Sequence, residues 1–350
     1  MSYVFLVAGL SLLVFGGDIL VRGAVALAVR MNIPHLIIGL TIVAFGTSAP
    51  ELLISIRAAL SDLSGITLGN VVGSNIANIW LVLGVPALIS AICCDQKNIH
   101  HNYFFMLGAC IILAALCFWS PLTIWHGVVL SVLMLLFLGD CFYRARQHKN
   151  EAEALDEDVE ELIEEIEGSK ETSLWKMVSL VILGLIGLAI GAELTIKGAV
   201  EIAKAFGVSD TTIGLTVVAI GTSLPELAAT VMAAIRGHSG LALGNAIGSN
   251  IYNICGVLGI TALITPIAVD PVFLSFDLWV MIAASLSILP FIIFKWKINK
   301  MVGVIFLLAY GLYTYKVLEL GRIQSIDQAA NQAASQSASQ AVINSGAVKV

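Results

Sequence analysis

Long apolar stretches separated by short polar segments make up most of this chain. The stretches are long enough to cross a hydrocarbon core about 30 Å thick, which takes about 20 helical residues. We therefore expect an all-α polytopic membrane protein with ten transmembrane helices. The expected helices cover residues 3–28, 36–60, 66–92, 103–119, 122–142, 174–203, 211–235, 241–266, 272–294 and 301–318.

One passage of the chain occurs twice. Residues 39–84 and 214–259 align without a gap at a constant offset of 175 positions, and 27 of the 46 pairs are identical. A duplicated packing unit needs to keep only its hydrophobic face, so retained polar positions indicate a preserved site. Among the identical positions are polar residues that recur in register: Thr41, Thr47, Ser48, Glu51, Asn70, Ser74, Asn75 and Asn78 match Thr216, Thr222, Ser223, Glu226, Asn245, Ser249, Asn250 and Asn253.

The number of crossings in each copy predicts how the copies are oriented. Each half contains five expected helices, an odd number, so the second half enters the membrane from the opposite side. We expect two inverted five-helix repeats, residues 1–143 and 174–320, joined by an acidic connector over 144–173 and followed by a low-complexity tail over 321–350. Transporters built from inverted repeats bind their substrate near the bilayer midplane, on helices broken by glycine or proline.

Such breaks occur just before the carboxylate of the duplicated passage. Gly46 and Pro50 precede Glu51, and the same pattern recurs 175 residues later. Proline lacks a backbone donor and displaces the carbonyl four residues earlier, here that of Gly46. A carbonyl oxygen freed beside a carboxylate is suited to binding a cation.

Oxygen-bearing side chains lie along one stripe of each of four expected helices. Thr47 and Glu51 are four residues apart, as are Ser74 and Asn78, so each pair shares a helix face. Small residues at GxxxG spacing, Gly69 with Gly73 and later Gly244 with Gly248, would let these helices approach closely. The candidate cation ligands are Thr47, Ser48, Glu51, Ser74 and Asn78 with Thr222, Ser223, Glu226, Ser249 and Asn253.

The chemistry of these ligands favours hard cations. Carboxylates cost ~2.5 to 3.5 kcal/mol each at mid-membrane, so both should face inward. Oxygen ligands suit Ca²⁺ or Na⁺, whereas Zn²⁺ and Cu prefer the His, Met or Cys that the stripe lacks, and Mg²⁺ prefers to keep waters. Two ionised glutamates carry a charge of −2, which one Ca²⁺, two or three Na⁺, or two protons can satisfy. If the unliganded site cannot reorient, one ion leaves only when another replaces it, which is antiport.

Composition and charge agree with a membrane location. The chain is 58% hydrophobic and 12% charged, about half the charge of a soluble protein, and its mean hydropathy is +0.95. No Lys or Arg precedes the first apolar run, which we expect to remain as a membrane helix. Eleven Lys and Arg lie in one set of loops and five in the other, which places both termini on the non-cytoplasmic side of a plasma membrane, expected to be a bacterial inner membrane.

Charges and thiols elsewhere are expected to be structural. Residues 151–171 hold 11 of the 24 acidic residues and favour a solvated connector, with a cation-sensing segment as the alternative. Asp18 with Arg22, and Glu193 with Lys197, are acid–base pairs at four-residue spacing. We expect each pair to be self-neutralised, with a role in helix movement as the alternative. The six cysteines are expected to act as small hydrophobic residues, and the tail beyond 323 to be disordered.

The duplicated motifs resemble those of a known family. GTSAPEL with GNVVGSNIANI, and GTSLPEL with GNAIGSNIYNI, resemble the α-repeats of the Ca²⁺/cation antiporter superfamily, specifically its prokaryotic sodium/calcium exchanger branch, and the likeness of layout covers about residues 1–320. The resemblance implies two inverted five-helix halves whose long first and sixth helices slide across a core with cation sites between the second, third, seventh and eighth helices. It implies that Glu51 and Glu226 are central carboxylates, that Thr47, Ser48, Thr222 and Ser223 are hydroxyl or carbonyl ligands, that Ser74, Asn78, Ser249 and Asn253 are flanking oxygens, and that Ala44 and Ala219 offer backbone carbonyls.

One departure from the family pattern leaves the coupling ion open. Sodium-coupled relatives often carry Asp where this chain has Asn78 and Asn253. The leading hypothesis is a secondary antiporter that exchanges Ca²⁺ for Na⁺, with exchange of Ca²⁺ or another cation for H⁺, or a passive channel, as alternatives. An intramembrane enzyme is least favoured because no chemically distinct nucleophile or base accompanies the carboxylates. The expected partners are Ca²⁺, Na⁺ and the lipid bilayer, with H⁺ left open, and we expect no cofactor and no nucleic acid. The sequence does not indicate an oligomeric state.

Overall fold

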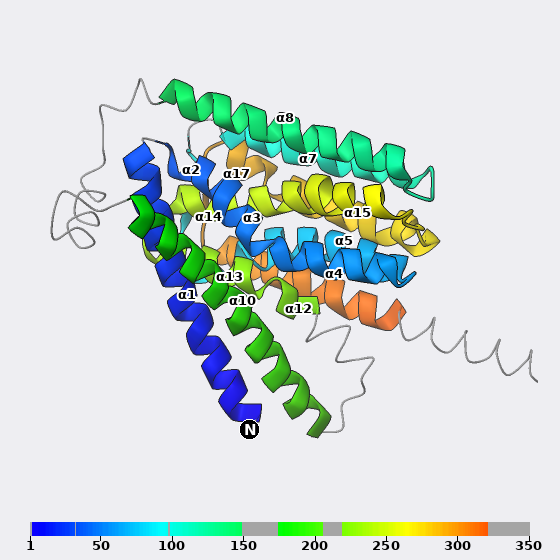
Figure 1. Cartoon of the computed structure of the whole chain (residues 1–350), viewed down its shortest axis with the longest axis horizontal. Coiled ribbons are helices and arrows are strands. Elements are labelled where there is room, and N and C mark those ends of the chain that lie inside the picture. Colours follow the sequence, from blue (N-terminus) through cyan, green and yellow to red (C-terminus); the bar gives the residue numbers. More distant parts are fainter. Residues whose placement is uncertain (1, 32, 97–98, 149–173, 206–218, 321–350) are drawn as a thin grey trace, which may run out of the picture. The chain divides into compact units, whose positions relative to one another are not determined.

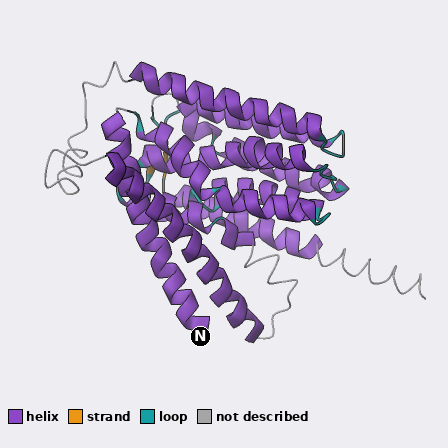
Figure 2. Cartoon of the chain, in the orientation of Figure 1, coloured by secondary structure: helices purple, strands orange, loops and turns teal. Residues whose placement is uncertain are grey.

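The computed structural model describes residues 2–31, 33–96, 99–148, 174–205 and 219–320. These residues are almost entirely helical, with two very short strands (Figures 1 and 2). The chain divides into two units, Met1–Tyr310 and Gly311–Val350, and the described part of the second unit is helical. The expected acidic segment at 151–171 and the tail at 321–350 lie outside the described residues.

The first half contains one long helix, one broken helix and three further helical segments that could cross a membrane. Its elements are α1 (Ser2–Met31), α2 (His35–Ile38), the π-helical η1 (Gly39–Val43), α3 (Ala44–Thr47), α4 (Ala49–Leu60), α5 (Ser64–Trp80), α6 (Gly84–Ile89), β1 (Ile92–Cys93), α7 (Ile99–Cys117) and α8 (Ile124–His148). The segments before and after Ser48 are inclined at 43° to one another, and α5 with α6 forms one apolar span.

The described part of the second half also begins with a long helix and contains a second broken helix. Its elements are α10 (Leu174–Ala205), α12 (Ala219–Thr222), α13 (Leu224–Ile235), α14 (Ser239–Ile251), η3 (Tyr252–Leu258), α15 (Gly259–Ile264), η4 (Phe273–Asp277), α16 (Leu278–Ser287), α17 (Leu289–Ile293), β2 (Lys297–Ile298) and the helix Lys300–Leu320. The π-helical turns η1, η3 and η4 were not expected from the apolar pattern, which does not distinguish them from regular helix.

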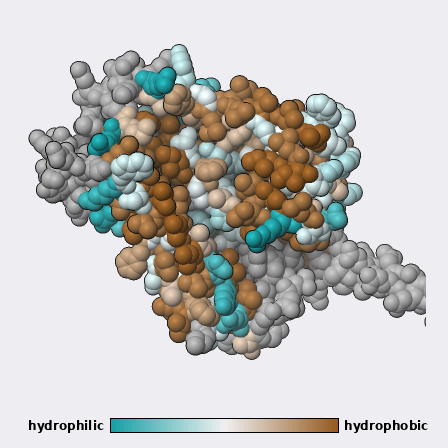
Figure 3. Space-filling model, in the orientation of Figure 1, coloured by the Kyte–Doolittle hydropathy of each residue, from teal (hydrophilic) through white to brown (hydrophobic). Residues whose placement is uncertain are grey.

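The polytopic helical class is confirmed. Eight helices of the described residues are long and apolar enough to cross a membrane, and the bent pair in the first half makes nine. The tenth stays a prediction, because residues 211–218 of the expected seventh helix are not described. Large apolar side chains such as Leu135, Phe142 and Leu308 are exposed on the outside of the helices, and Figure 3 shows apolar residues over much of one face. Exposed apolar surface of this extent suits contact with lipid.

Two short antiparallel contacts join the halves and establish their inversion. Ile92 of β1 pairs with Ile298 of β2, and an isolated bridge joins Leu122 to Ile267. Ile92 and Ile267 are 175 residues apart, so they are equivalent positions of the two halves. Because Ile92 precedes the 19-residue helix α7 and Leu122 follows it, the two contacts lie at opposite ends of that helix. Equivalent positions therefore lie on opposite sides, as the odd number of crossings predicted.

The long helices α1 and α10 lie side by side and cross the other helices at an angle (Figure 1). Glycines let their backbones touch. A Cβ on Gly16 would lie 2.9 Å from the nitrogen of Leu188, and one on Gly184 would lie 2.6 Å from the nitrogen of Leu20. A methyl group at either position would force the backbones apart, so we infer that the two helices form one tightly packed pair.

The GxxxG prediction is confirmed in the second half only. A Cβ on Gly244 would lie 2.5 Å from the oxygen of Leu36, and one on Gly248 would lie 2.8 Å from the oxygen of Leu40. These glycines thus bring α14 against α2, η1 and α3 of the first half. Among the described residues, a Cβ on Gly69 would approach only the Phe273 ring, at 3.6 Å or more, and a Cβ on Gly73 would have no atom within 4 Å. Residues 214–218, the repeat equivalents of 39–43, are not described.

One of the two predicted acid–base pairs is wrong. Arg22 Nε donates to Asp18 Oδ2 at 2.9 Å, as expected. No ion pair joins Glu193 to Lys197, both of which are exposed, although both lie in the described part of α10. The Lys197 ammonium instead lies 4.5 Å from the centre of the Phe5 ring on α1. A cation over an aromatic face is stabilised by the ring quadrupole, which explains why four-residue spacing alone did not produce the pair.

The cysteine prediction is confirmed. All six thiols are free, and all except the half-buried Cys93 are buried. In the loop after β1, burial raises the pKa of the Cys94 thiol to about 12, so that thiol is unreactive at neutral pH.

Candidate cation site

Each duplicated passage contains the same one-residue break in a helix. Ser48 separates α3 from α4 with φ −86° and ψ 4°, and Ser223 separates α12 from α13 with φ −88° and ψ 5°. Proline lies in the first turn of α4 and of α13, where its missing N–H costs nothing. Our expectation that Thr47 and Glu51 share a face assumed a continuous helix, and that argument fails because the helix breaks between them. Proline and glycine correctly predicted where it breaks.

The break places each glutamate at the beginning of a new helix. Glu51 lies in the first turn of α4 and Glu226 in the first turn of α13, and their exposed fractions are 0% and 1%. Unpaired backbone N–H groups give a helix N-terminus a partial positive charge, which favours a carboxylate there. Ser48, the residue at the first break and three positions before Glu51, contacts the carboxylate of Glu226. The helix breaks therefore bring a carboxylate from each half into one buried region.

Polar contacts join the halves at this region. Ser48 Oγ donates to Glu226 Oε1 at 3.1 Å. Thr47 Oγ1 lies 3.3 Å from Asn245 Oδ1 and donates to it, and it lies at the same distance from the carbonyl of Ala44. The hydroxyls of the first half therefore reach the carboxylate and amide of the second.

One asparagine in each half holds the backbone of the glutamate in that half. Asn245 Nδ2 donates to the carbonyl of Glu226 at 3.1 Å and to Thr230 Oγ1 at 2.9 Å. Asn70 Nδ2 makes the equivalent contacts, with the carbonyl of Glu51 at 3.3 Å and Ser55 Oγ at 3.0 Å. Sequence reasoning noted these asparagines as identical but gave them no role. The signal was available: both copies also keep a hydroxyl four residues after the glutamate.

Many oxygen atoms around the glutamates are buried without a hydrogen-bond partner among the described residues. Buried polar groups are nearly always paired in proteins, so a concentration of unpaired oxygens indicates a ligand site. An oxygen-rich set with two carboxylates fits a Ca²⁺ or Na⁺ ion. The unpaired atoms include both carboxylate oxygens of Glu51, Oε2 of Glu226, the hydroxyls of Ser223 and Ser249, and the side-chain amides of Asn78 and Asn253.

The structure places the predicted polar ligands as follows. All ten are buried, with exposed fractions of 8% or less: Thr47, Ser48, Glu51, Ser74, Asn78, Thr222, Ser223, Glu226, Ser249 and Asn253. They come from helices in mutual contact, since α4 packs on α5 and η3, α12 on α5, and α13 on α14. The carbonyl of Ala44 also accepts the backbone N–H of Ser48 at 3.0 Å, and Ala219 begins α12.

No group of three or more His, Cys, Asp or Glu side chains is arranged to hold a metal in the part of the chain that the structure describes. The two glutamates and the buried neutral oxygens named above are the candidate ligands for a cation in this region. This arrangement suits an ion that must also leave, because each neutral oxygen binds weakly.

We expect replacement of Asn245 by alanine to weaken cation binding without unfolding the protein. The change removes the amide that donates to the Glu226 carbonyl and to Thr230 Oγ1 and that accepts from Thr47 Oγ1. Each buried polar group left unpaired costs about 1 to 3 kcal/mol. Ca²⁺ uptake into vesicles should show a KM raised by roughly tenfold or more. The matched control is Asn299→Ala, which removes an exposed asparagine that caps Val302 far along the chain. Equal KM values for the two variants would show that Asn245 does not position the glutamate.

Comparison with known proteins agrees with this geometry. The model of the family described as sodium/calcium exchanger protein matches residues 1–141 and 176–318. The putative antiporter CaxA of Alkalimonas amylolytica is 38% identical over 315 residues, covering 89% of this chain and 97% of that protein. The sodium/calcium exchanger MaX1 of Methanosarcina acetivorans is 33% identical over 336 residues, covering 88% and 96%.

A solved structure agrees with the fold as well. The structure of the sodium-calcium exchanger NCX_Mj superposes with a TM-score of 0.76 at 35% sequence identity, and covers 90% of this chain and 98% of that one. The family model covers both halves of the duplication, and the relatives match over nearly their whole length. The chain therefore belongs to the sodium/calcium exchanger family.

Proposed function

We propose that this protein exchanges Ca²⁺ for Na⁺ across the membrane by alternating access. The observation that carries the proposal is the burial of Glu51 and Glu226, one from each inverted half, with Ser48 of the first half donating to the carboxylate of Glu226. Membership of an exchanger family supports cation antiport over the channel and enzyme alternatives. The resemblance to the exchangers MaX1 and NCX_Mj supports Ca²⁺ and Na⁺ as the ions.

Charge balance explains how one site serves both ions. Two ionised glutamates in a buried region are unfavourable without a cation, since each charge has lost its hydration. One Ca²⁺ neutralises them, and so do two Na⁺. In this proposal the neutral oxygens of Thr47, Ser74 and Asn253 complete the coordination of whichever ion is present. Exchange follows because the charged, ion-free site is too costly to reorient.

The packing of the long helix α10 supports a role in controlling access to the site. Gly46 faces Leu185 and Gly221 faces Ile196, both on α10, with no space for a Cβ at either glycine. One helix therefore lies against the broken segment of both halves. Because α10 packs tightly on α1, we propose that the two move together and cover the site from one side at a time.

The same charge argument applies to protons, so the coupling ion must be tested. Vesicles that contain the purified protein are loaded with Na⁺, K⁺ or an acidic buffer and diluted into medium with radiolabelled Ca²⁺. We expect uptake from Na⁺-loaded vesicles only. Uptake into vesicles that have only an acidic interior would identify H⁺, and not Na⁺, as the coupling ion. Uptake without any counter-ion gradient would indicate a passive channel.

We propose a multi-pass location in the plasma membrane with both termini outside the cytoplasm. The distribution of Lys and Arg among the loops supports it, because loops rich in these residues stay in the cytoplasm. A cysteine introduced in place of Ser2 should react with an impermeant maleimide in intact cells. Reaction only after the cells are opened would reverse the orientation.

A further inference from the structure

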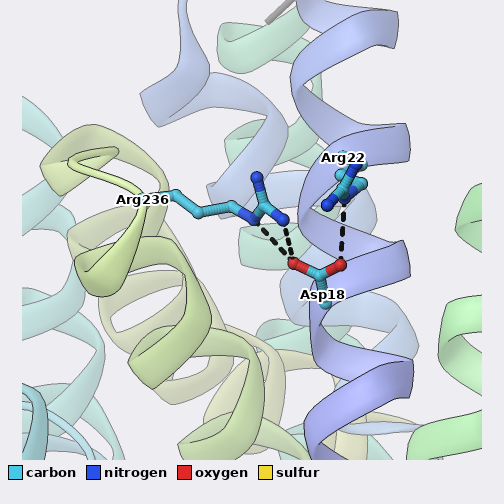
Figure 4. Close-up of polar contacts among 3 residues, drawn as sticks. All are labelled: Asp18, Arg22 and Arg236. Atoms are coloured by element: carbon cyan, nitrogen blue, oxygen red, sulfur yellow. Dashed lines mark hydrogen bonds and ion pairs between the residues drawn. The ribbon is translucent and has the colours of Figure 1, made fainter. Parts of the chain in front are cut away.

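The helix α1 is held against the second half by an ion pair that the acid–base spacing did not predict. Arg236, which caps the C-terminus of α13, donates from Nε to Asp18 Oδ1 at 2.7 Å, and its Nη2 contacts the same oxygen. Asp18 also keeps its pair with Arg22 through the other oxygen (Figure 4). The Asp18 and Arg236 side chains are only 22% and 17% exposed, so water screens this contact less than a surface pair.

The backbone beside this ion pair is in close contact as well. A Cβ on Gly17 would lie 3.1 Å from the oxygen of Ala228 and 3.0 Å from Cγ of Met232, both on α13. Helix α1 thus lies directly on the C-terminal part of α13 and is tethered at its end. The ion pair and the glycine contact together hold the long helix α1 against α13, the helix that carries Glu226.

The equivalent contact, between α10 and α4, is not made in this structure. By the 175-residue offset, the equivalents of Asp18 and Arg236 are Glu193 and Ser61. Helices α10 and α4 do not pack along one another to the extent that α1 and α13 do. Glu193 is exposed, and within the described residues it has no ion-pair partner. The two halves therefore differ in this contact, as inverted repeats do when a transporter faces one side of the membrane.

The residues for a second ion pair are nevertheless present. Ser61 cannot pair with Glu193, but Arg57 lies four residues before it on the same face of α4, at the position equivalent to Met232. Arg57 is exposed and makes no ion pair in the described part of the chain, including with Asp62. The residue equivalent to Gly17 is Ala192, whose methyl group keeps α10 from approaching α4 as closely as α1 approaches α13. Glu193 has a longer side chain than Asp18, which would offset part of that greater separation.

We propose that two mutually exclusive ion pairs hold the two end states of the transport cycle: Asp18 with Arg236 in the state described here, and Glu193 with Arg57 in the opposite state. The inference rests on the proposed alternating access and not on the identity of the coupled ion. When α1 leaves α13, the first pair breaks. When α10 closes on α4, the second pair forms. Each end state thus gains a charge contact that the other lacks, and the balance between the pairs sets the populations of the two states.

Disulfide formation between positions 57 and 193 tests this proposal. The variant Arg57→Cys with Glu193→Cys is reconstituted in vesicles and oxidised, and the remaining thiols are counted with a maleimide. The native thiols are mostly buried and give a low background. The matched control combines Arg57→Cys with Ser179→Cys, which lies 14 residues, or about 21 Å, away along α10. We expect a disulfide in the first variant and not in the control.

Adding Arg236→Ala to the same variant tests the coupling between the two pairs. Loss of the Asp18 contact should raise the rate of disulfide formation about fivefold or more. Arg236→Lys keeps the charge and should leave the rate near its original value. Failure of the 57–193 disulfide to form, or a rate that Arg236→Ala does not raise, would overturn the proposal. The readout requires no Na⁺ gradient, so a 57–193 disulfide that forms faster with Arg236→Ala in a protein without Na⁺-driven uptake would support the alternation of the two contacts and reject only the proposed function.

Discussion

Replacing either central glutamate by glutamine is expected to abolish exchange. Glu51→Gln and Glu226→Gln each remove one of the two charges that offset the desolvation of a bound Ca²⁺. A unit charge pair about 4 Å apart contributes about 4 kcal/mol at an effective dielectric constant of 20. We therefore expect Ca²⁺ uptake at subsaturating concentration to fall by roughly a hundredfold or more in each variant. Initial rates of radiolabelled Ca²⁺ uptake into vesicles provide the measurement.

The fold should survive these substitutions. Glutamine has nearly the shape of glutamate, and it removes a buried charge whose desolvation opposes folding. The melting temperature of each variant should therefore equal or exceed that of the wild type. Glu319→Gln is the matched control, because Glu319 is exposed and its one ion pair among the described residues is with Lys316. Uptake at the wild-type rate in both site variants would remove these carboxylates from the transport pathway.

Replacing Gly248 by leucine is expected to separate the two halves at the site. A Cβ at this position would lie 2.8 Å from Cα and the oxygen of Leu40 and from Cβ of Ala44. Two of these three atoms belong to the backbone, which cannot rotate away. Overpacking of this kind costs typically about 1 to 3 kcal/mol and sometimes more. The displacement of α14 would also move Asn245 and Ser249, so we expect both the melting temperature and the rate of Ca²⁺ uptake to fall.

The control for this substitution is Gly139→Leu on α8. No atom of the described residues lies within 4 Å of a Cβ at Gly139, so the larger side chain meets no obstacle there. Leucine also has a higher helix propensity than glycine. The control should therefore keep both stability and transport. If Gly248→Leu melts and transports like the control, the close contact between α14 and the first half is not required.

Duplication in the sequence predicted the principal features of the fold and of the candidate site. The constant offset and the odd number of crossings predicted inversion, and the bridges at Ile92 and Ile267 bear it out. The rarity of intramembrane acids predicted that Glu51 and Glu226 face inward, and both are buried. These inferences succeeded because they depend on connectivity and on the cost of charge in lipid, which do not require knowledge of packing.

Contacts between helices that are distant in sequence could not be predicted in the same way. Helical spacing suggested that Glu193 pairs with Lys197, but Phe5 of another helix attracts that lysine. Arg236 directly follows the expected helix 211–235, and nothing in its spacing indicated that it reaches Asp18 on α1. Asn245 was known to be duplicated, but its bond to the carbonyl of Glu226 depends on how α13 and α14 face each other. Periodicity within one helix contains no information on which face meets which neighbour.

The central claim is that Ca²⁺ and Na⁺ replace each other at one site shared by Glu51 and Glu226. Its most direct test follows both ions in the same vesicles, with radiolabelled Na⁺ inside and radiolabelled Ca²⁺ outside. We predict that Na⁺ leaves only when external Ca²⁺ is present, that Ca²⁺ enters in a fixed ratio to the Na⁺ released, and that Glu51→Gln and Glu226→Gln stop both fluxes together. Fluxes of the two ions that proceed independently, or that persist in both variants, would contradict the claim.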